Sequence, residues 1–191
     1  MNDLVFATSN KGKLVELQGL VGAGVHVRSL KDFPEIGEIP ETADTFEGNS
    51  ELKARAVAKA TGLWALADDS GLMVDALDGR PGVYSARYAP TDTERISRLL
   101  AELMNVPDAK RTARFVCSLC LCSPGGDVVF TRGTCEGRIG HVARGAHGFG
   151  YDPIFELPDG RTLAELTHDQ KSGLSHRGQA FRLMVPELTR R

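Results

Sequence analysis

The sequence predicts an α/β fold built on a mixed β-sheet. Short apolar runs alternate with helical patterns in the first half of the chain, which is typical of strand–helix–strand units. The second half contains two long apolar runs joined by the turn SPGGD at residues 123–127, the pattern of an antiparallel hairpin. Together these observations indicate a mixed sheet with flanking helices.

The composition is that of one soluble globular domain. The 191 residues are 41% hydrophobic and 25% charged, without repeats or a linker, so we expect a single domain over 1–191. The net charge of −2 argues against a dedicated nucleic-acid binder. No apolar run approaches the roughly 20 residues that span a bilayer, and the start MNDLVFATSN does not resemble a signal peptide. We therefore expect a cytoplasmic protein without a nucleic-acid or membrane partner.

The first part of the chain is predicted to contain two strands, a helix and a loop. In order, these are a strand over 4–7, a helix over 11–21, a strand over 25–30 and a loop over 31–44. The helix is indicated by Leu14, Leu17 and Val21, which fall on one stripe.

An Ala-rich helix is expected over 45–62. Asp44 with Glu47 three residues later resembles a capping box, and Gly62 is suited to end the helix. Two short strands are expected to follow, one over 64–67 and one over 72–74.

The remaining chain holds the clearest helix in the sequence. Ile96, Leu99, Leu100 and Leu103 recur at i, i+3, i+4 and i+7, which predicts an amphipathic helix over 91–104. The other features are a Gly/Pro loop over 78–90, the two long strands around 123–127, a Gly-rich stretch over 144–155, a short segment at 163–166 and a last helix that begins near Ser175 and is disturbed by Pro186.

The cysteines predict buried, reduced thiols. Cys117 and Cys120 have the C-x-x-C spacing, but residues three apart on a strand face opposite sides of the sheet. A redox pair would require a helix start, and a zinc site would require a second ligand pair.

The stretch FATSNKGK, residues 6–13, joins a strand to a helix. Free backbone N–H groups at the helix start, with Lys11 and Lys13 beside them, would form a cradle for phosphate. The spacing is not that of a Walker A loop. A capped helix with solvated lysines is the alternative.

A polar pair lies on the helix predicted over 45–62. Asn49 and Lys53 are four residues apart and share one face with Ala56 and Ala60. The small neighbouring side chains indicate a helix face that another group can approach closely, but an ordinary surface face explains the pattern equally well.

Asp68 and Asp69 interrupt an apolar segment, where a desolvated carboxylate must find a partner. Neighbouring strand residues point to opposite faces of the sheet. Both carboxylates can therefore act at one point only if the strand ends there, and Ser70–Gly71 would permit such a bend. Mg²⁺ prefers carboxylates and leaves room for phosphates, so one aspartate on a metal and the other on a water molecule is the functional hypothesis. A helix N-cap or a turn is the structural alternative.

The Gly-rich stretch offers a place for a flat ligand. Gly148 and Gly150 let the backbone come close, and Phe149 or Tyr151 could stack on a base.

Cationic groups lie near the start of the last helix. Lys171, His176 and Arg177 add charge and hydrogen-bond donors there, and Ser175 could cap the helix. A solvated first turn is the alternative, although cations at a helix start oppose the helix dipole. Taken together, the four stretches describe a site for a nucleoside triphosphate with Mg²⁺.

Five segments carry a family resemblance. ATSNKGK, ADDSGL, GRPGVYSARYA, GFGYDPIF and KSGLSHRGQA resemble, in the same order, the signature segments of the non-canonical purine NTP pyrophosphatases, the family of bacterial RdgB and eukaryotic inosine triphosphatase, or HAM1-like, proteins. The similarity runs from Leu4 to about Leu188. It implies a homodimer with a long mixed sheet and a central cleft between two lobes. It also implies Mg²⁺-dependent hydrolysis of ITP, dITP and XTP to the monophosphate and pyrophosphate.

The resemblance implies roles for individual residues. Asp69 matches the proton acceptor and Asp68 its acidic neighbour near the metal. Asp69 and Glu41 are the expected metal ligands, with Glu38 as an alternative to Glu41 because loop lengths vary there. The expected substrate contacts are Thr8, Ser9, Asn10, Lys11, Gly12, Lys13, Lys53, Ser70, Phe149, Gly150, Tyr151, Asp152, Lys171, His176 and Arg177. Gly48 replaces an acid found in many relatives, which we treat as harmless.

The expected mechanism is in-line attack of water on the α-phosphorus, with pyrophosphate leaving. Asp69 orients and deprotonates the water or ligates the metal, Asp68 and Glu41 help to hold Mg²⁺, and lysines offset the charge on the leaving group. A donor from the loop near Phe149, or from His176–Arg177, would select the purine 6-oxo group.

Two other functions fit part of the pattern. A phosphatase with an aspartyl nucleophile in DDSG would release inorganic phosphate, but the D-x-D arrangement is absent. A nucleotide-binding regulatory module would bind ITP without turnover, and it has no need for the acid pair.

Overall fold

The computed structural model describes residues 3–21 and 24–190, and the chain divides into two units. Unit 1 consists of Met1–Asp69, Cys117–Gly133 and Gln179–Arg191, and unit 2 of Ser70–Val116 and Thr134–Gly178. The chain therefore leaves unit 1 directly after the aspartate pair and returns to it twice.

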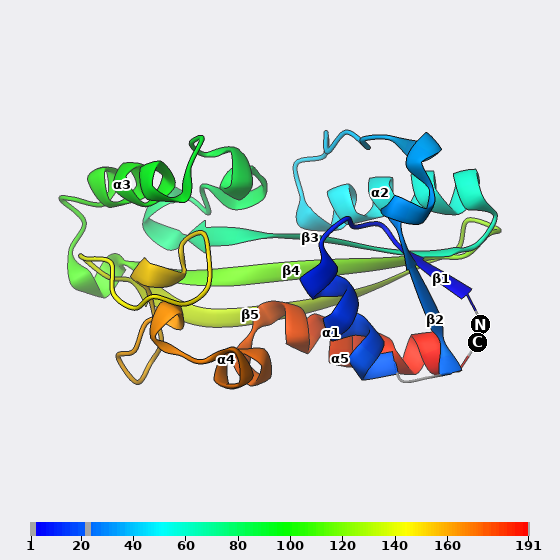
Figure 1. The fold of residues 1–191 in the computed structure, drawn as a ribbon. Coiled ribbons are helices and arrows are strands. Elements are labelled where there is room, and N and C mark those ends of the chain that lie inside the picture. The colour runs from blue at the N-terminus through cyan, green and yellow to red at the C-terminus, as the bar shows by residue number, and fades with distance from the viewer. Residues whose placement is uncertain (1–2, 22–23, 191) are drawn as a thin grey trace. The chain divides into compact units, whose positions relative to one another are not determined.

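The strands form one mixed sheet (Figure 1). They are β1 (Asp3–Phe6), β2 (His26–Ser29), β3 (Trp64–Val74), β4 (Thr112–Cys122), β5 (Val128–Ile139) and β6 (Phe155–Glu156). They pair in the order β2-β1-β3-β4-β5-β6. Strand β1 is parallel to both β2 and β3, whereas β5 and β6 are antiparallel, so the predicted mixed sheet is confirmed.

Five α-helices accompany the sheet in the described residues. They are α1 (Lys11–Val21), α2 (Phe46–Thr61), α3 (Asp92–Glu102), α4 (His168–Leu174) and α5 (His176–Thr189). The sequence did not predict α4. Pro186 lies inside α5, which continues to Thr189. Among the described residues, no helix has the length and apolar character needed to cross a membrane.

Unit 1 has a hydrophobic layer on each face of its part of the sheet. Helix α2 covers one face, and α1 and α5 cover the other (Figure 1). Alternate strand residues supply the two layers because side chains alternate along a strand. On β3, Leu66 packs in the layer with Leu17 and Phe181, and Ala65 in the layer with Ala54.

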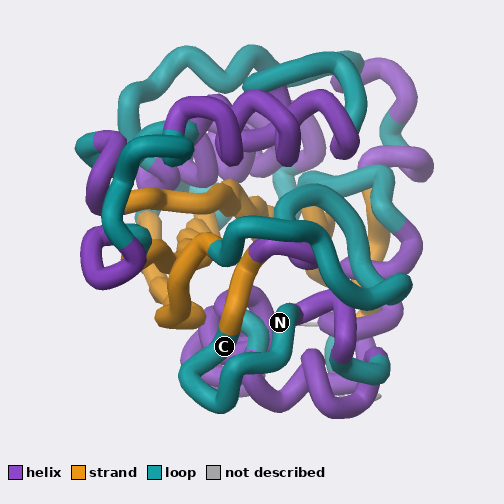
Figure 2. The backbone as a smooth tube through the Cα atoms, turned by 90° about the vertical axis from the view of Figure 1, so that its left-hand side faces the viewer, coloured by secondary structure: helices purple, strands orange, loops and turns teal. Residues whose placement is uncertain are grey.

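Unit 2 has its own core beneath helix α3. Leu99 and Leu103 are fully buried, as the amphipathic pattern predicts, and pack in one cluster with Phe115 and Phe155. The rings of Phe115 and Phe155 lie 4.7 Å apart between centroids. Figure 2 shows loops in teal in front of strands of the sheet in orange.

Two local expectations are corrected. Asp68 and Asp69 lie inside a single continuous strand β3, not at a break between two strands. The N-cap of α2 is Thr45, whose side chain accepts from the Gly48 N–H, and not Asp44. The αL cap at Gly62 is confirmed. The hairpin turn over 123–127 is also confirmed, closed by the Ser123 N–H donating to the Asp127 carbonyl at 2.8 Å.

The cysteines are buried and free, as expected. Cys117 and Cys120 belong to the two opposite layers of unit 1, which follows from their odd spacing on β4. Burial raises the pKa of the Cys120 thiol to about 12 and that of Cys135 to about 11, so both are protonated at neutral pH.

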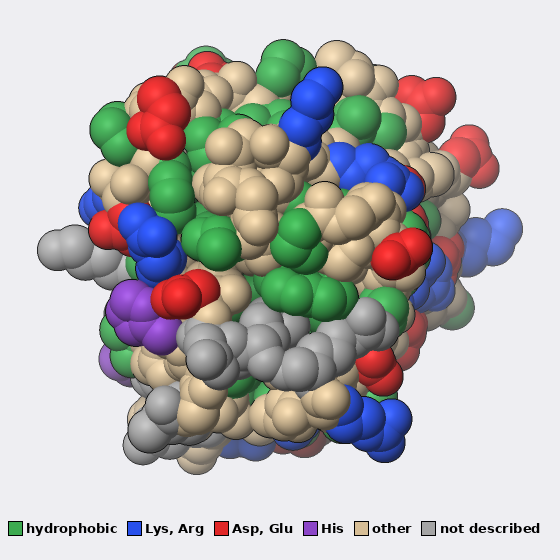
Figure 3. All heavy atoms as spheres, turned by 90° about the vertical axis from the view of Figure 1, so that its right-hand side faces the viewer, with side chains coloured by type: hydrophobic (Ala, Val, Ile, Leu, Met, Phe, Trp, Pro, Cys, Tyr) green, Lys and Arg blue, Asp and Glu red, His purple; other side chains and the backbone are tan. Residues whose placement is uncertain are grey.

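On the face drawn in Figure 3, acidic and basic side chains are interspersed among hydrophobic ones, in keeping with the small net charge.

Candidate functional site

Asp68 is a buried carboxylate held by Lys13 in unit 1. The Lys13 Nζ donates to both carboxylate oxygens, at 2.9 and 2.7 Å, from the first turn of α1. The Asp68 side chain is 2% exposed and that of Lys13 is 23% exposed. The lysine stabilises a charge that burial would otherwise disfavour.

Asp69 is also buried, and Asn49 of α2 holds it. The Asn49 Nδ2 donates to Oδ2 of Asp69 at 3.0 Å, and its Oδ1 accepts from the Ala43 N–H at 2.9 Å. Because Asn49 is completely buried, the two bonds fix its amide and thereby orient the Asp69 carboxylate.

The two aspartates face opposite sides of β3. Residues two apart on a strand share a face. Asp68 therefore lies on the face of Leu66, which packs with α1 and α5, and Asp69 lies on the face of Ala67, which packs with α2. Since the strand does not end at this pair, the bend proposed at Ser70–Gly71 is wrong and the two carboxylates do not converge on one point through it.

Glu41 lies on the same side of unit 1 as Asp69. The Lys53 Nζ donates to Glu41 Oε1 at 2.5 Å, and Lys53 follows Asn49 by one helical turn of α2. The polar face predicted on this helix therefore holds two carboxylates from outside the helix. Glu38, the alternative ligand, is exposed.

The start of α1 is a capped helix. The Asn10 Oδ1 accepts from the N–H groups of Gly12 and Lys13, at 2.9 and 3.3 Å, and the Asn10 N–H donates to Thr8 Oγ1. The N–H groups of Gly12 and Lys13 are therefore not free, contrary to the free backbone N–H groups expected at this helix start. Ser9 is exposed, and the Lys11 side chain lies outside the described part of the chain.

In unit 2, the Gly-rich stretch separates the two aromatic candidates. The Phe149 side chain is exposed, whereas Tyr151 is buried in the core with its hydroxyl donating to the Ser85 carbonyl at 2.9 Å. Burial raises the pKa of the Tyr151 hydroxyl. A stacking role for Tyr151 is therefore wrong, and Phe149 is the ring available to a ligand.

Asp152 organises the surroundings of that ring. It is buried, accepts from the Phe149 N–H at 2.9 Å and pairs with Lys171. The Lys171 Nζ lies 5.1 Å from the centroid of the Phe149 ring. Gly148 has a φ of +78°, and a Cβ there would overlap Asp152 Oδ2, so this position requires glycine.

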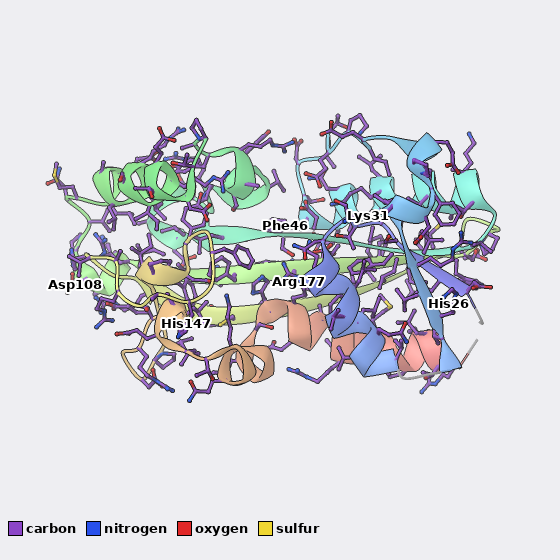
Figure 4. All side chains as sticks on the ribbon, in the orientation of Figure 1. His26, Lys31, Phe46, Asp108, His147 and Arg177 are labelled. Carbon is purple, nitrogen blue, oxygen red and sulfur yellow. The ribbon has the colours of Figure 1, made fainter. Side chains whose placement is uncertain are left out.

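The start of α5 is capped by Ser175, as expected, and its first turn is not fully exposed to solvent. Ser175 Oγ accepts from the Gly178 N–H at 3.0 Å. The His176 ring stacks on Phe115 with centroids 5.1 Å apart, and both His176 and Arg177 are half-buried. Figure 4 labels Arg177 at this end of the helix. Ser70, in unit 2, is half-buried as well.

One residue of this region was missed by sequence reasoning. Asp92 Oδ2 accepts from the Gly150 N–H at 2.8 Å, across 58 residues of chain. No local pattern indicates such a contact. Because the Phe149 and Gly150 N–H groups both donate to carboxylates, neither is the free donor expected for a purine oxygen.

Comparisons with known proteins establish the family. The model of the Ham1 family matches residues 4–187. A protein of Shouchella clausii named dITP/XTP pyrophosphatase is 50% identical over 185 residues, which cover 95% of this chain and 93% of that protein. One of the same name from a Nostoc species is 51% identical over 187 residues, covering 97% and 93%. The chain belongs to the Ham1 family.

Solved Ham1 structures share the fold. A HAM1 protein from Coxiella burnetii has a TM-score of 0.94 at 42% identity, with all of both chains covered. The Staphylococcus aureus Ham1 protein has a TM-score of 0.92 at 39% identity, with 98% of both chains covered. The mixed sheet with flanking helices is therefore the Ham1 fold, as the sequence resemblance implied.

Proposed function

We propose that this Ham1 protein is a nucleoside-triphosphate diphosphatase that hydrolyses dITP, ITP and XTP to the monophosphate and pyrophosphate with Mg²⁺. The observation that carries the proposal is the buried carboxylate of Asp69, oriented by Asn49 on the same α2 face that holds Glu41 through Lys53. The names of the relatives at 50% and 51% identity support the substrate class. The proposed role, in a cytoplasmic homodimer, is to remove non-canonical purines from the nucleotide pool.

The oxygen donors on this face suit a magnesium ion. Among the described residues, no group of three or more His, Cys, Asp or Glu side chains is placed to hold a metal. Mg²⁺ usually takes only one or two carboxylates and completes its shell with water and substrate phosphates, so a smaller set suffices. Asp69 and Glu41 are the ligands we propose, since Glu41 is tied to α2 and Glu38 is exposed. The bound ion would neutralise phosphate charge.

The chain's own groups do the rest of the proposed chemistry. Asp69 accepts a proton from the water that attacks the α-phosphorus, and pyrophosphate departs in line. We assign both Lys13, which pairs with Asp68 on the α1 side of β3, and Lys53, on the α2 side, to the negative charge of the leaving group. Their ion pairs with Asp68 and Glu41 keep both ammonium groups in place before the substrate arrives.

Unit 2 supplies the proposed recognition of the base. Phe149 stacks on the purine, beside the Lys171 ammonium. The donor to the 6-oxo group comes from His176–Arg177, since the loop N–H groups are already used. Adenine presents an amino group at that position, and a polar mismatch of this kind discriminates by about 10⁴.

A product assay tests the proposal. Purified protein is incubated with Mg²⁺ and, separately, ITP, dITP, XTP, GTP or ATP, and pyrophosphate and phosphate are measured. We expect pyrophosphate, with kcat/KM for dITP and XTP at least about 10³-fold above that for ATP. Release of inorganic phosphate would favour the aspartyl phosphatase instead, and tight binding without turnover would favour the regulatory module. Either outcome overturns the proposal.

A further inference from the structure

The loop that presents Phe149 combines an exposed ring with two permissive backbone positions. Gly148 and Gly150 have φ angles of +78° and +62°, and Phe149 is 67% exposed. A ring on such a loop would ordinarily be mobile, and ordering it at each binding event would weaken affinity. The ring therefore needs a restraint that acts on the backbone.

Two carboxylates restrain consecutive N–H groups of this loop within unit 2. Asp152 accepts from Phe149 at 2.9 Å and Asp92 accepts from Gly150 at 2.8 Å. They come from different elements, because Asp152 follows the loop in the chain and Asp92 is the first residue of α3. The loop is thus fixed from two directions.

Asp92 also has a partner on its own helix. Its other oxygen, Oδ1, accepts from Arg95 Nη1 at 2.6 Å, and Arg95 Nε donates to the Ala89 carbonyl at 2.9 Å. Helix α3 is anchored in the core of unit 2 by Leu99, which is fully buried. The contact therefore connects the loop to a fixed part of the unit.

The start of α3 does not need the Asp92 carboxylate as a cap. Thr91 and Glu94 already form a complete capping box, with Glu94 Oε2 accepting from the Thr91 N–H at 3.0 Å and Thr91 Oγ1 accepting from the Glu94 N–H at 3.2 Å. The Asp92 carboxylate is consequently directed at the loop.

We infer that Asp92 is a positioning residue for purine binding, which holds the Phe149 platform in its binding conformation through the Gly150 N–H. This inference rests on the proposed function, since it assigns the ring to the base. Without Asp92 the ring loses its fixed place beside the Lys171 ammonium, which lies 5.1 Å from its centroid. The platform touches the base and not the reacting phosphorus, so the loss appears in KM and not in kcat.

The experiment compares Asp92→Ala with two matched variants, Asp92→Asn and Glu94→Ala. The amide of Asp92→Asn keeps an oxygen that can accept from the Gly150 N–H, while Glu94→Ala removes the other carboxylate of the same helical turn. For each we would measure kcat and KM with dITP, the affinity for IMP and for pyrophosphate, and amide hydrogen exchange at Gly150 by NMR.

For Asp92→Ala we expect a KM about tenfold higher with kcat within about twofold, a moderate effect because the Asp92 side chain is 47% exposed. IMP affinity should fall by a similar factor, pyrophosphate affinity should not change, and the Gly150 amide should exchange faster. Asp92→Asn and Glu94→Ala should both stay within about threefold of the wild-type KM.

The outcomes separate this inference from the proposed function. If the wild-type protein hydrolyses dITP but Asp92→Ala leaves KM unchanged, or Glu94→Ala raises it equally, the positioning role of Asp92 is overturned and the proposed function stands. If the wild-type protein hydrolyses none of the purine triphosphates, the proposed function is overturned, and the role of Asp92 with it.

Discussion

Asp69→Asn is expected to lower kcat for dITP by about a thousandfold, the scale of a lost general base. The introduced amide is nearly isosteric, and its oxygen can still accept from Asn49 Nδ2, so the buried contact between β3 and α2 persists. What disappears is the negative charge and the proton acceptor. Steady-state kinetics with dITP and Mg²⁺ measure the effect.

Binding separates a chemical role for Asp69 from a structural one. Calorimetry with the inactive variant should give a Kd for dITP within about tenfold of the KM of the wild-type protein, because Glu41 remains to hold Mg²⁺ and the lysine and base contacts stay in place. Asp44→Asn, which changes an exposed aspartate just before α2, serves as the control and should retain full activity. A kcat for Asp69→Asn within tenfold of wild type would remove Asp69 from its proposed role.

Lys13→Met is expected to impair both stability and substrate binding. It leaves the Asp68 carboxylate, 2% exposed, without the ammonium that donates to both of its oxygens. Breaking a fully buried ion pair costs about 3–5 kcal/mol, and the partial exposure of Lys13 reduces the expected loss of unfolding free energy to about 2 kcal/mol. Urea unfolding measures this change.

The kinetic part of the Lys13 prediction concerns phosphate. We expect the KM for dITP to rise by about tenfold or more, while the affinity for IMP changes less, because Lys13 is assigned to the leaving pyrophosphate. Lys59→Met, at an exposed position of α2, is the control for loss of a lysine. Adding Asp68→Asn to Lys13→Met should restore much of the stability, since position 68 then carries no buried charge, but not the KM. Equal effects on dITP and IMP would contradict the assignment to phosphate.

Local patterns in the sequence were sufficient for elements that depend on neighbours. The helix at α3 follows from apolar residues spaced to form one stripe, and the αL cap at Gly62 and the hairpin over 123–127 follow from turn chemistry. Helix α4 was missed, although Thr167 and Gln170 form a capping box that could have indicated it.

The continuity of β3 could not be read locally. Two adjacent buried aspartates in the middle of a strand are unfavourable unless other groups donate hydrogen bonds to them. The donors are Lys13, 55 residues before Asp68, and Asn49, 20 residues before Asp69. The sequence drew attention to both partners, but not to which carboxylate each would hold or to the opposite faces of the pair.

The Gly-rich stretch shows the same limit. Phe149 and Tyr151 are two residues apart in one loop, and nothing in their spacing tells which is exposed and which is buried. Tyr151 is buried in the core of unit 2, where its hydroxyl donates to the carbonyl of Ser85, 66 residues earlier in the chain. The contact between Asp92 and Gly150 is equally remote from any motif.

The most direct test of the account is the position of oxygen from solvent after hydrolysis of dITP in H₂¹⁸O with Mg²⁺. Water that attacks the α-phosphorus places one ¹⁸O in the monophosphate and none in pyrophosphate. Mass spectrometry of the two products should show this distribution. Label in pyrophosphate, or in released inorganic phosphate, would mean attack at another phosphorus and would contradict the proposed chemistry of Asp69.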